Sequence, residues 1–231
     1  PPSIPLNLVG DYAGGSLYLA LGILAALYEA QHSGQGQVID AAIVDGTASL
    51  ATTFFGMYAA GMLSPLRGTN VSDSGSHYYD VYRCADDKWI SVGPIEVKFY
   101  LQLLERLQLD PATLGSQSDP ATWPAAKSLL AARFRTRTRD EWAKVFADSD
   151  ACVAPVLDWD EAPDHPHLSE RGTFVEVDGV VQPAPTPRFS RTPLATPTPP
   201  AAVNPENTAA ALQPWTSAQD VASWRAAGII D

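Results

Sequence analysis

Cysteine is scarce in this sequence of 231 residues, which contains only Cys84 and Cys152. The two lie in unrelated contexts, and the sequence has neither a C-x-x-C motif nor paired histidines at a metal-binding spacing. These absences exclude a disulfide framework and a zinc site, and they favour a reducing compartment. We therefore expect a cytoplasmic protein without a metal centre.

Positive charge is also scarce. Lysine and arginine together number 15 against 26 aspartates and glutamates, which gives a formal net charge of -11 and an isoelectric point near 4.6. Recognition of nucleic acid would call for a basic stripe, so we expect no nucleic-acid partner. An anionic cofactor would need a local cluster of basic groups or helix N-termini.

Long apolar runs are missing as well. The longest covers residues 17–28, and the charged residues Asp11 and Glu29 lie on either side of it. A membrane span needs about 20 predominantly apolar residues, so we expect a buried core helix and no span. The sequence also lacks a P-loop, a G-x-G-x-x-G motif and a signal peptide. It opens P-P-S-I-P-L without methionine, and we expect it to begin in mid-protein.

The first 60 residues predict helix, strand and helix in succession. Residues 14–32 are apolar on every face, as in a helix packed inside a larger domain, and S-G-Q-G-Q (33–37) is typical of a turn. The apolar run 38–44 predicts a short strand of the kind found in parallel sheets, and residues 47–60 predict a second helix. Residues 1–60 thus indicate the end of an α/β layer.

The pattern changes after a predicted linker at 61–78, which is rich in Gly, Ser, Asn and Pro. Residues 78–84 and 89–93 predict a β-hairpin around a D-D-K turn, and 97–109 an amphipathic helix with Phe99, Leu103, Leu104 and Leu107 inside. Residues 124–134 predict a further helix. The sequence T-R-D-E (138–141) predicts a capping box that opens a helix ending at 146, and residues 151–157 predict a strand. We expect a small α+β domain at 79–182.

The C-terminal segment, 183–231, is expected to return to the first layer. Prolines are dense from 183 to 205, so this part is predicted to be extended. A last helix at 218–227 is predicted to begin at T-S-A-Q (216–219) and to stop at Gly228.

Two acidic residues are candidates for a functional role. Asp11, in N-L-V-G-D-Y-A-G-G-S, is either the N-terminal cap of the first helix or a reactive carboxylate, since Gly10, Gly14 and Gly15 would let a ligand approach the backbone. Glu96, in G-P-I-E, either stabilises the first turn of a helix or projects into a site at a strand-to-helix junction.

The histidines offer weaker candidates. His32 near a helix end is expected to be a capping charge, and His165 and His167 to lie in a surface loop. His77, in the segment before the hairpin, is the best histidine candidate for lining a pocket. Composition and spacing alone lead no further than a soluble α/β protein with two acids of interest.

Longer segments resemble a known family. The opening N-L-V-G-D-Y-A-G-G-S-L-Y-L-A-L-G-I-L-A-A-L and the following S-G-Q-G-Q-V-I-D-A-A-I-V-D-G are similar to α-methylacyl-CoA racemases of the family III CoA-transferase superfamily. Further matches run in order along the chain: R-G-T-N (67–70), H-Y-Y-D-V-Y-R-C-A-D (77–86), V-G-P-I-E-V-K-F-Y (92–100), A-D-S-D-A-C-V-A-P-V-L (147–157) and P-R-F-S-R-T-P (187–193).

The resemblance implies an α/β fold in which the end of a Rossmann-like large domain is joined to a small α+β domain, with two chains interlocked in a homodimer. It implies racemisation of 2-methylacyl-CoA thioesters, with coenzyme A present only as part of the substrate and no separate cofactor. Asp11 matches a catalytic acid/base, and Glu96 matches a glutamate that reaches the site from the partner's small domain. The expected substrate-binding residues are Asn7, Gly10, Gly14, Tyr79 and Ile95.

One catalytic residue that the resemblance implies has no match in this sequence. The racemases' second base is a histidine in a segment upstream of the matched one, so this chain resembles a C-terminal portion and is expected to be inactive alone. One alternative is a CoA transferase in which Asp11 is the nucleophile, although those enzymes carry a run of glycines where V-G-P-I-E-V-K has one. The other is a non-catalytic CoA-binding or assembly fragment.

Overall fold

The first helix begins earlier than the sequence suggested. In the computed structural model, which describes residues 4–200 and 204–230, a π-helix, η1 (Leu8–Leu17), leads directly into α1 (Tyr18–Ser33). The predicted turn at 33–37 is confirmed, because Gly34 adopts a left-handed conformation with φ 74° and donates its N–H to the Ala30 carbonyl at 2.9 Å. Contacts along the chain define two compact units, 1–156 and 157–231.

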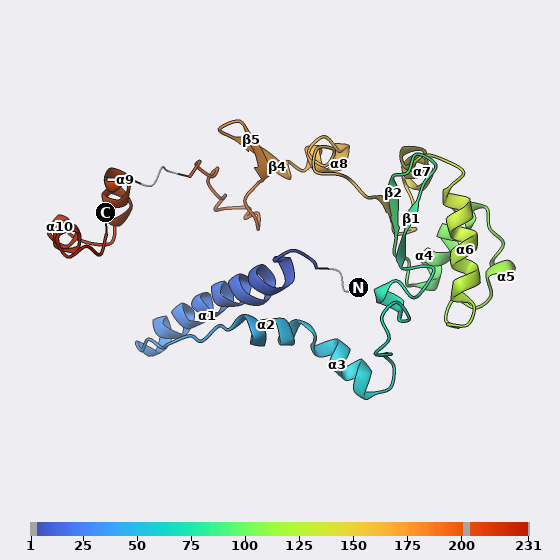
Figure 1. The fold of residues 1–231 in the computed structure, drawn as a ribbon, viewed down its shortest axis with the longest axis horizontal. Helices are drawn as coiled ribbons and strands as arrows, with labels where there is room; N and C mark the ends of the chain where they lie inside the picture. Colours follow the sequence, from blue (N-terminus) through green and yellow to red (C-terminus); the bar gives the residue numbers. More distant parts are fainter. Residues whose placement is uncertain (1–3, 201–203, 231) are drawn as a thin grey trace. The chain divides into compact units, whose positions relative to one another are not determined.

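The strand predicted at 38–44 is wrong. The segment before α2 (Ile43–Leu50) has no regular structure, and the Val38 side chain is 97% exposed. A strand is stable only when a neighbour satisfies its backbone groups, and no strand among the described residues pairs with this segment. The second predicted helix is confirmed but is interrupted at Ala51, so that α3 (Thr52–Ala59) follows α2 as a separate helix (Figure 1).

Glycines bring η1 and α2 into backbone contact. Gly14, Gly15 and Gly46 are buried here, and a methyl group placed on Gly46 would overlap the Gly14 carbonyl oxygen. The Tyr18 hydroxyl adds a hydrogen bond of 2.9 Å to the Ser49 hydroxyl. Small residues at both surfaces thus allow the two helices to meet without intervening side chains.

Most of the apolar surface of this helical segment is exposed. None of the residues of α1 is buried within the described chain, and Leu17, Leu21 and Leu24 are each about two-thirds exposed. The prediction of a buried core helix is therefore not confirmed by this chain alone. Because the helix starts at Leu8, the segment Leu8–Ser33 is also long and apolar enough to cross a membrane by length and composition, a property that core helices share.

An antiparallel sheet begins the second part of unit 1, confirming the predicted hairpin. Its strands lie in the order β1 (Asp80–Arg83), β2 (Trp89–Val92) and β3 (Val153–Pro155). Asp80 pairs with Val92 at one end of the hairpin and Arg83 with Trp89 at the other. The short 3-10 turn η2 (Val71–Asp73) precedes this sheet. All strand pairs in the described residues are antiparallel, so the expected Rossmann-like parallel sheet is not formed here.

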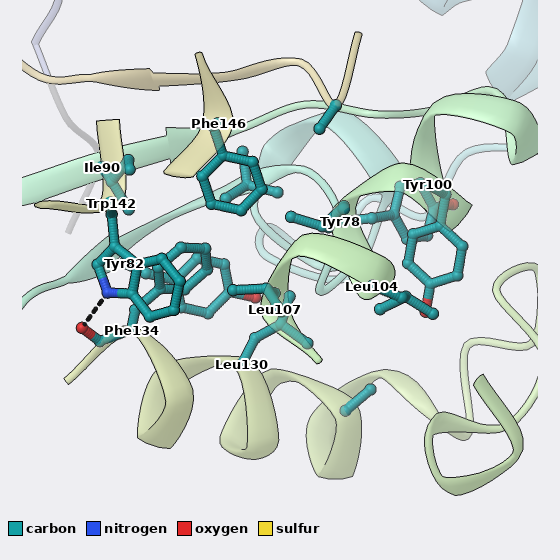
Figure 2. Packing of buried hydrophobic residues seen from close by; sticks show 14 of the residues in the cluster. Tyr78, Tyr82, Ile90, Tyr100, Leu104, Leu107, Leu130, Phe134, Trp142 and Phe146 are labelled. Atoms are coloured by element: carbon teal, nitrogen blue, oxygen red, sulfur yellow. Dashed lines mark hydrogen bonds between the residues drawn. The ribbon is translucent and has the colours of Figure 1, made fainter. Parts of the chain in front are cut away.

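Helices cover this sheet and enclose its core. They are α4 (Val97–Leu107), α5 (Pro111–Leu114), α6 (Trp123–Phe134) and α7 (Arg139–Phe146). Figure 2 shows Tyr82, Phe134 and Trp142 at one end of the core, where the Trp142 indole donates to the Phe134 carbonyl at 2.8 Å. The predicted inner face of α4 is confirmed for its three leucines, whereas Phe99 is half-buried and Tyr100 is buried instead.

The predicted capping box at 138–141 is confirmed. Thr138 accepts from the Glu141 N–H, and the Glu141 carboxylate accepts from the Thr138 N–H at 2.8 Å. The final residues of the stretch expected to be a linker, 76–78, are buried with the small-domain core.

The described residues of unit 2, which are 157–200 and 204–230, form a hairpin and three helices. These elements are α8 (Pro166–Glu170), β4 (Phe174–Val177), β5 (Val180–Pro183), α9 (Pro205–Leu212) and α10 (Ala218–Ala226). The hairpin turns at Asp178 and Gly179, both with positive φ, and residues 184–200 are irregular, as the prolines suggested. The last helix is confirmed, but its capping box joins Ser217 to Asp220, one residue later than predicted. α8, the hairpin and α9 were not predicted.

Candidate active site

Asp11 lies inside η1 and does not cap it. The cap position is Asn7, which makes no side-chain capping hydrogen bond, and Asp11 is the fourth residue of the helix. The interpretation of Asp11 as an N-terminal cap is therefore wrong. Its side chain is exposed, and among the described residues only its backbone carbonyl has a hydrogen-bond partner, the Ser16 hydroxyl at 3.1 Å. The carboxylate is free to meet another molecule.

The glycines around Asp11 differ in their surroundings. Gly14 and Gly15 are buried against Thr47 and Ile43 of α2, so these two serve the contact between the helices. Gly10 is half-buried, and a methyl group there would meet only an Ile43 methyl at 3.8 Å. Of the predicted substrate-binding residues on this helix, Asn7 and Gly10 are thus the accessible ones, while Gly14 sets the helix position.

Glu96 occupies the junction between β2 and α4. It is the N-terminal cap residue of α4, and its carbonyl accepts from the N–H groups of Phe99 and Tyr100 at 3.0 Å. Its carboxylate makes no capping hydrogen bond and is exposed, so the backbone of Glu96, not its side chain, starts the helix. The carboxylate projects from the strand-to-helix junction, as the alternative interpretation required.

Tyr79 lies beside this junction. Its ring is 39% exposed and approaches Gly93, where an added methyl group would meet Tyr79 Cε2 at 3.8 Å. Tyr79 and Gly93 line a surface hollow together with Cys152, which also accepts the Gly93 N–H at its carbonyl, at 2.9 Å. Ile95, in the same turn, is 50% exposed.

The Cys152 thiol lies close enough to Glu96 for the two to interact electrostatically. Burial, and then the nearby Glu96 and Asp150 carboxylates, raise the pKa of Cys152. The structure therefore brings Tyr79, Glu96 and Cys152 together in the small domain. Sequence reasoning missed Cys152, and no signal marked it, since a single cysteine in a predicted strand is equally typical of a core.

Asp11 and Glu96 are not brought together in this chain. Among the described residues, no hydrogen bond or ion pair joins them, and they belong to separate elements, η1 and the start of α4. Their meeting in one site, with Glu96 supplied by a second copy, stays a prediction.

His77 does not line a pocket. Its side chain is fully buried, and its Nε2 lies 2.7 Å from the Tyr100 hydroxyl within a cluster that also contains Tyr78 and Trp123. Burial and the Lys127 charge lower the pKa of His77 to about 4, so it is neutral at physiological pH. The pocket prediction is wrong because the ring is fully buried against the rings of Tyr78 and Tyr100. The described residues contain no group of three or more His, Cys, Asp or Glu side chains that would hold a metal ion.

Known proteins resemble this chain over most of its length. Residues 1–224 match the family described as CoA-transferase family III. The chain is 43% identical over 194 residues to the mouse α-methylacyl-CoA racemase and 40% identical over 193 residues to the human one. Each alignment covers 83% of this chain but 51% and 50% of the relatives, so the chain spans about half their length. Relatives of lower identity include CoA-transferases.

The fold has a counterpart among solved structures. A CAIB/BAIF family protein from Brucella suis matches with a TM-score of 0.71 and 21% identity, covering 92% of this chain and 57% of that chain. This likeness concerns the mixed α/β fold alone.

Proposed function

Because this chain belongs to CoA-transferase family III, we propose that it forms part of an α-methylacyl-CoA racemase. Such an isomerase inverts the carbon next to the thioester carbonyl of a 2-methylacyl-CoA. The observation that carries the proposal is the identity of 43% and 40% to two racemases, each over 83% of this chain.

Inversion requires two proton transfers. One acid/base removes the proton from C2, the electron pair of that C–H bond passes into the thioester carbonyl as an enolate, and a second acid/base returns a proton to the opposite face. We assign Asp11 to one of these steps, since its carboxylate has no partner among the described residues. The second base is proposed to be a histidine from polypeptide outside this sequence, and His77 is not a substitute because it is enclosed in the small-domain core.

The enolate oxygen also needs a hydrogen-bond donor. Backbone N–H groups at the start of η1, around Asn7 and Gly10, are suitable donors, because the first N–H groups of a helix have no partner within it. We propose that Asn7 and Gly10 form this side of the acyl thioester site, while Gly14, buried against Thr47, sets the position of the helix. Tyr79 and Ile95 would contact the substrate from the small domain, with Glu96 beside the reacting carbon.

The exposed apolar surface of η1 and α1–α3 supports a role for further polypeptide. Leu21, Leu24 and Phe55 are each about two-thirds exposed, and the racemase relatives are about twice as long as their match to this chain. We propose that this surface packs against the counterpart of the relatives' remaining half, within an interlocked homodimer in the cytoplasm. Coenzyme A would enter only as part of the substrate.

A CoA transferase is the alternative activity. There the Asp11 carboxylate would attack the thioester carbonyl, forming an acyl anhydride and releasing CoA thiolate. The thiolate would then attack the Asp11 carbonyl carbon, freeing the acid and leaving a CoA thioester on Asp11. Family membership favours this alternative, while the single glycine of V-G-P-I-E-V-K favours the racemase. A non-catalytic CoA-binding or assembly role is the third possibility, and the lack of a matching histidine favours it.

One experiment separates the three activities. The longest native form of the protein that contains this chain is incubated with one enantiomer of a 2-methylacyl-CoA in deuterium oxide. Deuterium at C2 with loss of optical purity supports the racemase. CoA exchange into a free acid, with an enzyme adduct that hydroxylamine traps, supports the transferase and contradicts the racemase. Binding without either reaction supports the third role.

Two variants test whether racemisation depends on Asp11. Asp11→Asn keeps the shape of the side chain but removes its basicity, and should reduce racemisation by at least about 100-fold. The control is Asp160→Asn, which removes an equal charge from an exposed residue of unit 2. Equal activity of both variants would contradict the assignment. The isolated chain is expected to be inactive.

A further inference from the structure

The turn that carries Glu96 is fixed by groups outside it. At one end, the Gly93 N–H donates to the Cys152 carbonyl at 2.9 Å, which extends the pairing of β2 with β3. Pro94 is fully buried, and the Ile95 N–H donates back to the Gly93 carbonyl at 3.0 Å. The carbonyls of Pro94 and Ile95 remain, and neither belongs to a helix or a sheet.

Gln117 satisfies both of these carbonyls. Its side-chain nitrogen Nε2 donates to the Pro94 carbonyl at 3.2 Å and to the Ile95 carbonyl at 2.9 Å. A primary amide has two N–H groups, so this one side chain uses its full donor capacity on two successive peptide groups immediately before Glu96. Gln117 comes from the loop between α5 and α6, more than 20 residues further along the chain.

Gln117 is itself anchored by a residue of the core. Its backbone carbonyl accepts from the indole nitrogen of Trp123 at 2.8 Å, and Trp123 is buried at the start of α6. A continuous set of hydrogen bonds thus leads from the core, through Gln117, to the peptide groups before Glu96. The Glu96 carboxylate has no capping bond of its own, so its direction depends on this backbone.

We propose that Gln117 is a positioning residue that holds the Glu96 carboxylate toward the substrate. The inference rests on the proposed function, in which Glu96 serves the proton-transfer site. Without the amide, two carbonyls lose their donors and the junction becomes free to rotate, while the rest of α4 stays anchored by its buried leucines. A displacement of about 1 Å in a catalytic group is enough to reduce a rate by up to about 100-fold.

The test is Gln117→Met in the longest native form of the protein. Methionine keeps the length of glutamine but has no N–H donor. We expect kcat for deuterium incorporation to fall about tenfold with KM little changed, because the carboxylate beside the reacting carbon would be misplaced while substrate binding is retained. In the double variant Gln117→Met with Glu96→Gln, kcat should be little lower than in Glu96→Gln alone, since both substitutions remove the same function.

Gln102→Met is the matched control. Gln102 lies on α4, and its side chain likewise bonds to backbone, where it accepts from the Asp150 N–H at 3.0 Å. It does not touch the turn before Glu96, so its variant should stay within about twofold of the parent rate. Full additivity of the Gln117 and Glu96 effects, or an equal loss in Gln102→Met, would overturn the proposal.

Cys152 provides a readout that does not depend on turnover. Its thiol is exposed and senses the Glu96 carboxylate, whereas Cys84 is buried and its pKa is raised to about 11. Alkylation by iodoacetamide against pH should show a lower midpoint in Glu96→Gln, because a negative neighbour is removed. Gln117→Met should move the midpoint part of the way to that value.

The two readouts separate failure of the inference from failure of the proposed function. If no variant changes turnover but Gln117→Met shifts the Cys152 midpoint, Gln117 positions Glu96 and the role of Glu96 in the reaction is wrong. If Glu96→Gln lowers turnover while Gln117→Met changes neither turnover nor midpoint, the positioning role of Gln117 is wrong.

Discussion

The small domain and the N-terminal helices use apolar residues in opposite ways. In the small domain, Leu104, Phe134 and Trp142 are at most 1% exposed and surround one core (Figure 2). In the helices at 8–59, comparable side chains such as Leu24 and Phe55 are about two-thirds exposed, and the contacts are made mainly by glycines. The first region carries its own stabilising burial within this chain, whereas the second presents apolar side chains that are exposed among the described residues.

The largest expected effect is a difference in stability between matched leucine-to-alanine substitutions in the two regions. Leu104→Ala removes a side chain that is 1% exposed, and should lower the free energy of unfolding of the small domain by about 3–4 kcal/mol. Leu24→Ala removes one that is 66% exposed, and should change stability by less than about 0.5 kcal/mol in this chain. Amide hydrogen exchange of α6 and α1 measures each region separately.

The proposed packing of α1 predicts a different result in the longest native form of the protein that contains this chain. If further polypeptide covers the apolar surface of α1 there, Leu24→Ala should be destabilising by about 2 kcal/mol or more. An unchanged effect would show that α1 stays exposed, and would contradict the proposed packing. A large effect of Leu24→Ala in this chain alone would contradict the contrast itself.

Local signals explain why the small domain was predicted better. The capping box at Thr138 and the hairpin around Asp87 each depend on residues within a few positions, and both are confirmed. The strand at 38–44 failed because a strand depends on its neighbour, which the apolar run around Val38 cannot supply. For that part, the two helices were predicted correctly and the strand of the expected α/β layer was not.

The acids of the candidate site could be proposed from the sequence, but the contacts that support them could not. Asp11 was a candidate because of the glycines around it and Glu96 because of its predicted strand-to-helix junction, and motifs of a resembling family contain both. The contacts of Gln117 with Pro94 and Ile95 could not be found, because they join positions more than 20 residues apart and follow no periodic pattern. Burial of His77 depends in the same way on packing against distant Tyr100.

A second prediction concerns acid stability of the small domain. Burial and the Lys127 charge lower the pKa of His77 to about 4 in the folded state, against 6.5 when unfolded. Between these pH values the unfolded chain binds the proton and the folded one does not, so stability falls as the pH decreases from 6.5 to 4. The expected loss is about 2–3 kcal/mol.

Denaturant unfolding at several pH values measures this loss. His77→Gln removes the titrating group and should flatten that part of the pH dependence, even if the substitution is itself destabilising. An equal pH slope in His77→Gln would contradict the assignment to His77.

The smallest effect tests the glycine contact of the helical region. Gly46→Ala would place a methyl group on the Gly14 carbonyl oxygen, forcing α2 away from η1, and should destabilise this pair of helices by about 1–3 kcal/mol. Alanine is otherwise the better helix former by about 1 kcal/mol, so Gly56→Ala in α3, where nothing lies within 4 Å, should stabilise its helix. Amide exchange of η1 and α3 measures both. Because Asp11 lies on η1, Gly46→Ala should also move its carboxylate, whereas stabilisation by Gly46→Ala would mean that η1 and α2 do not meet at these glycines.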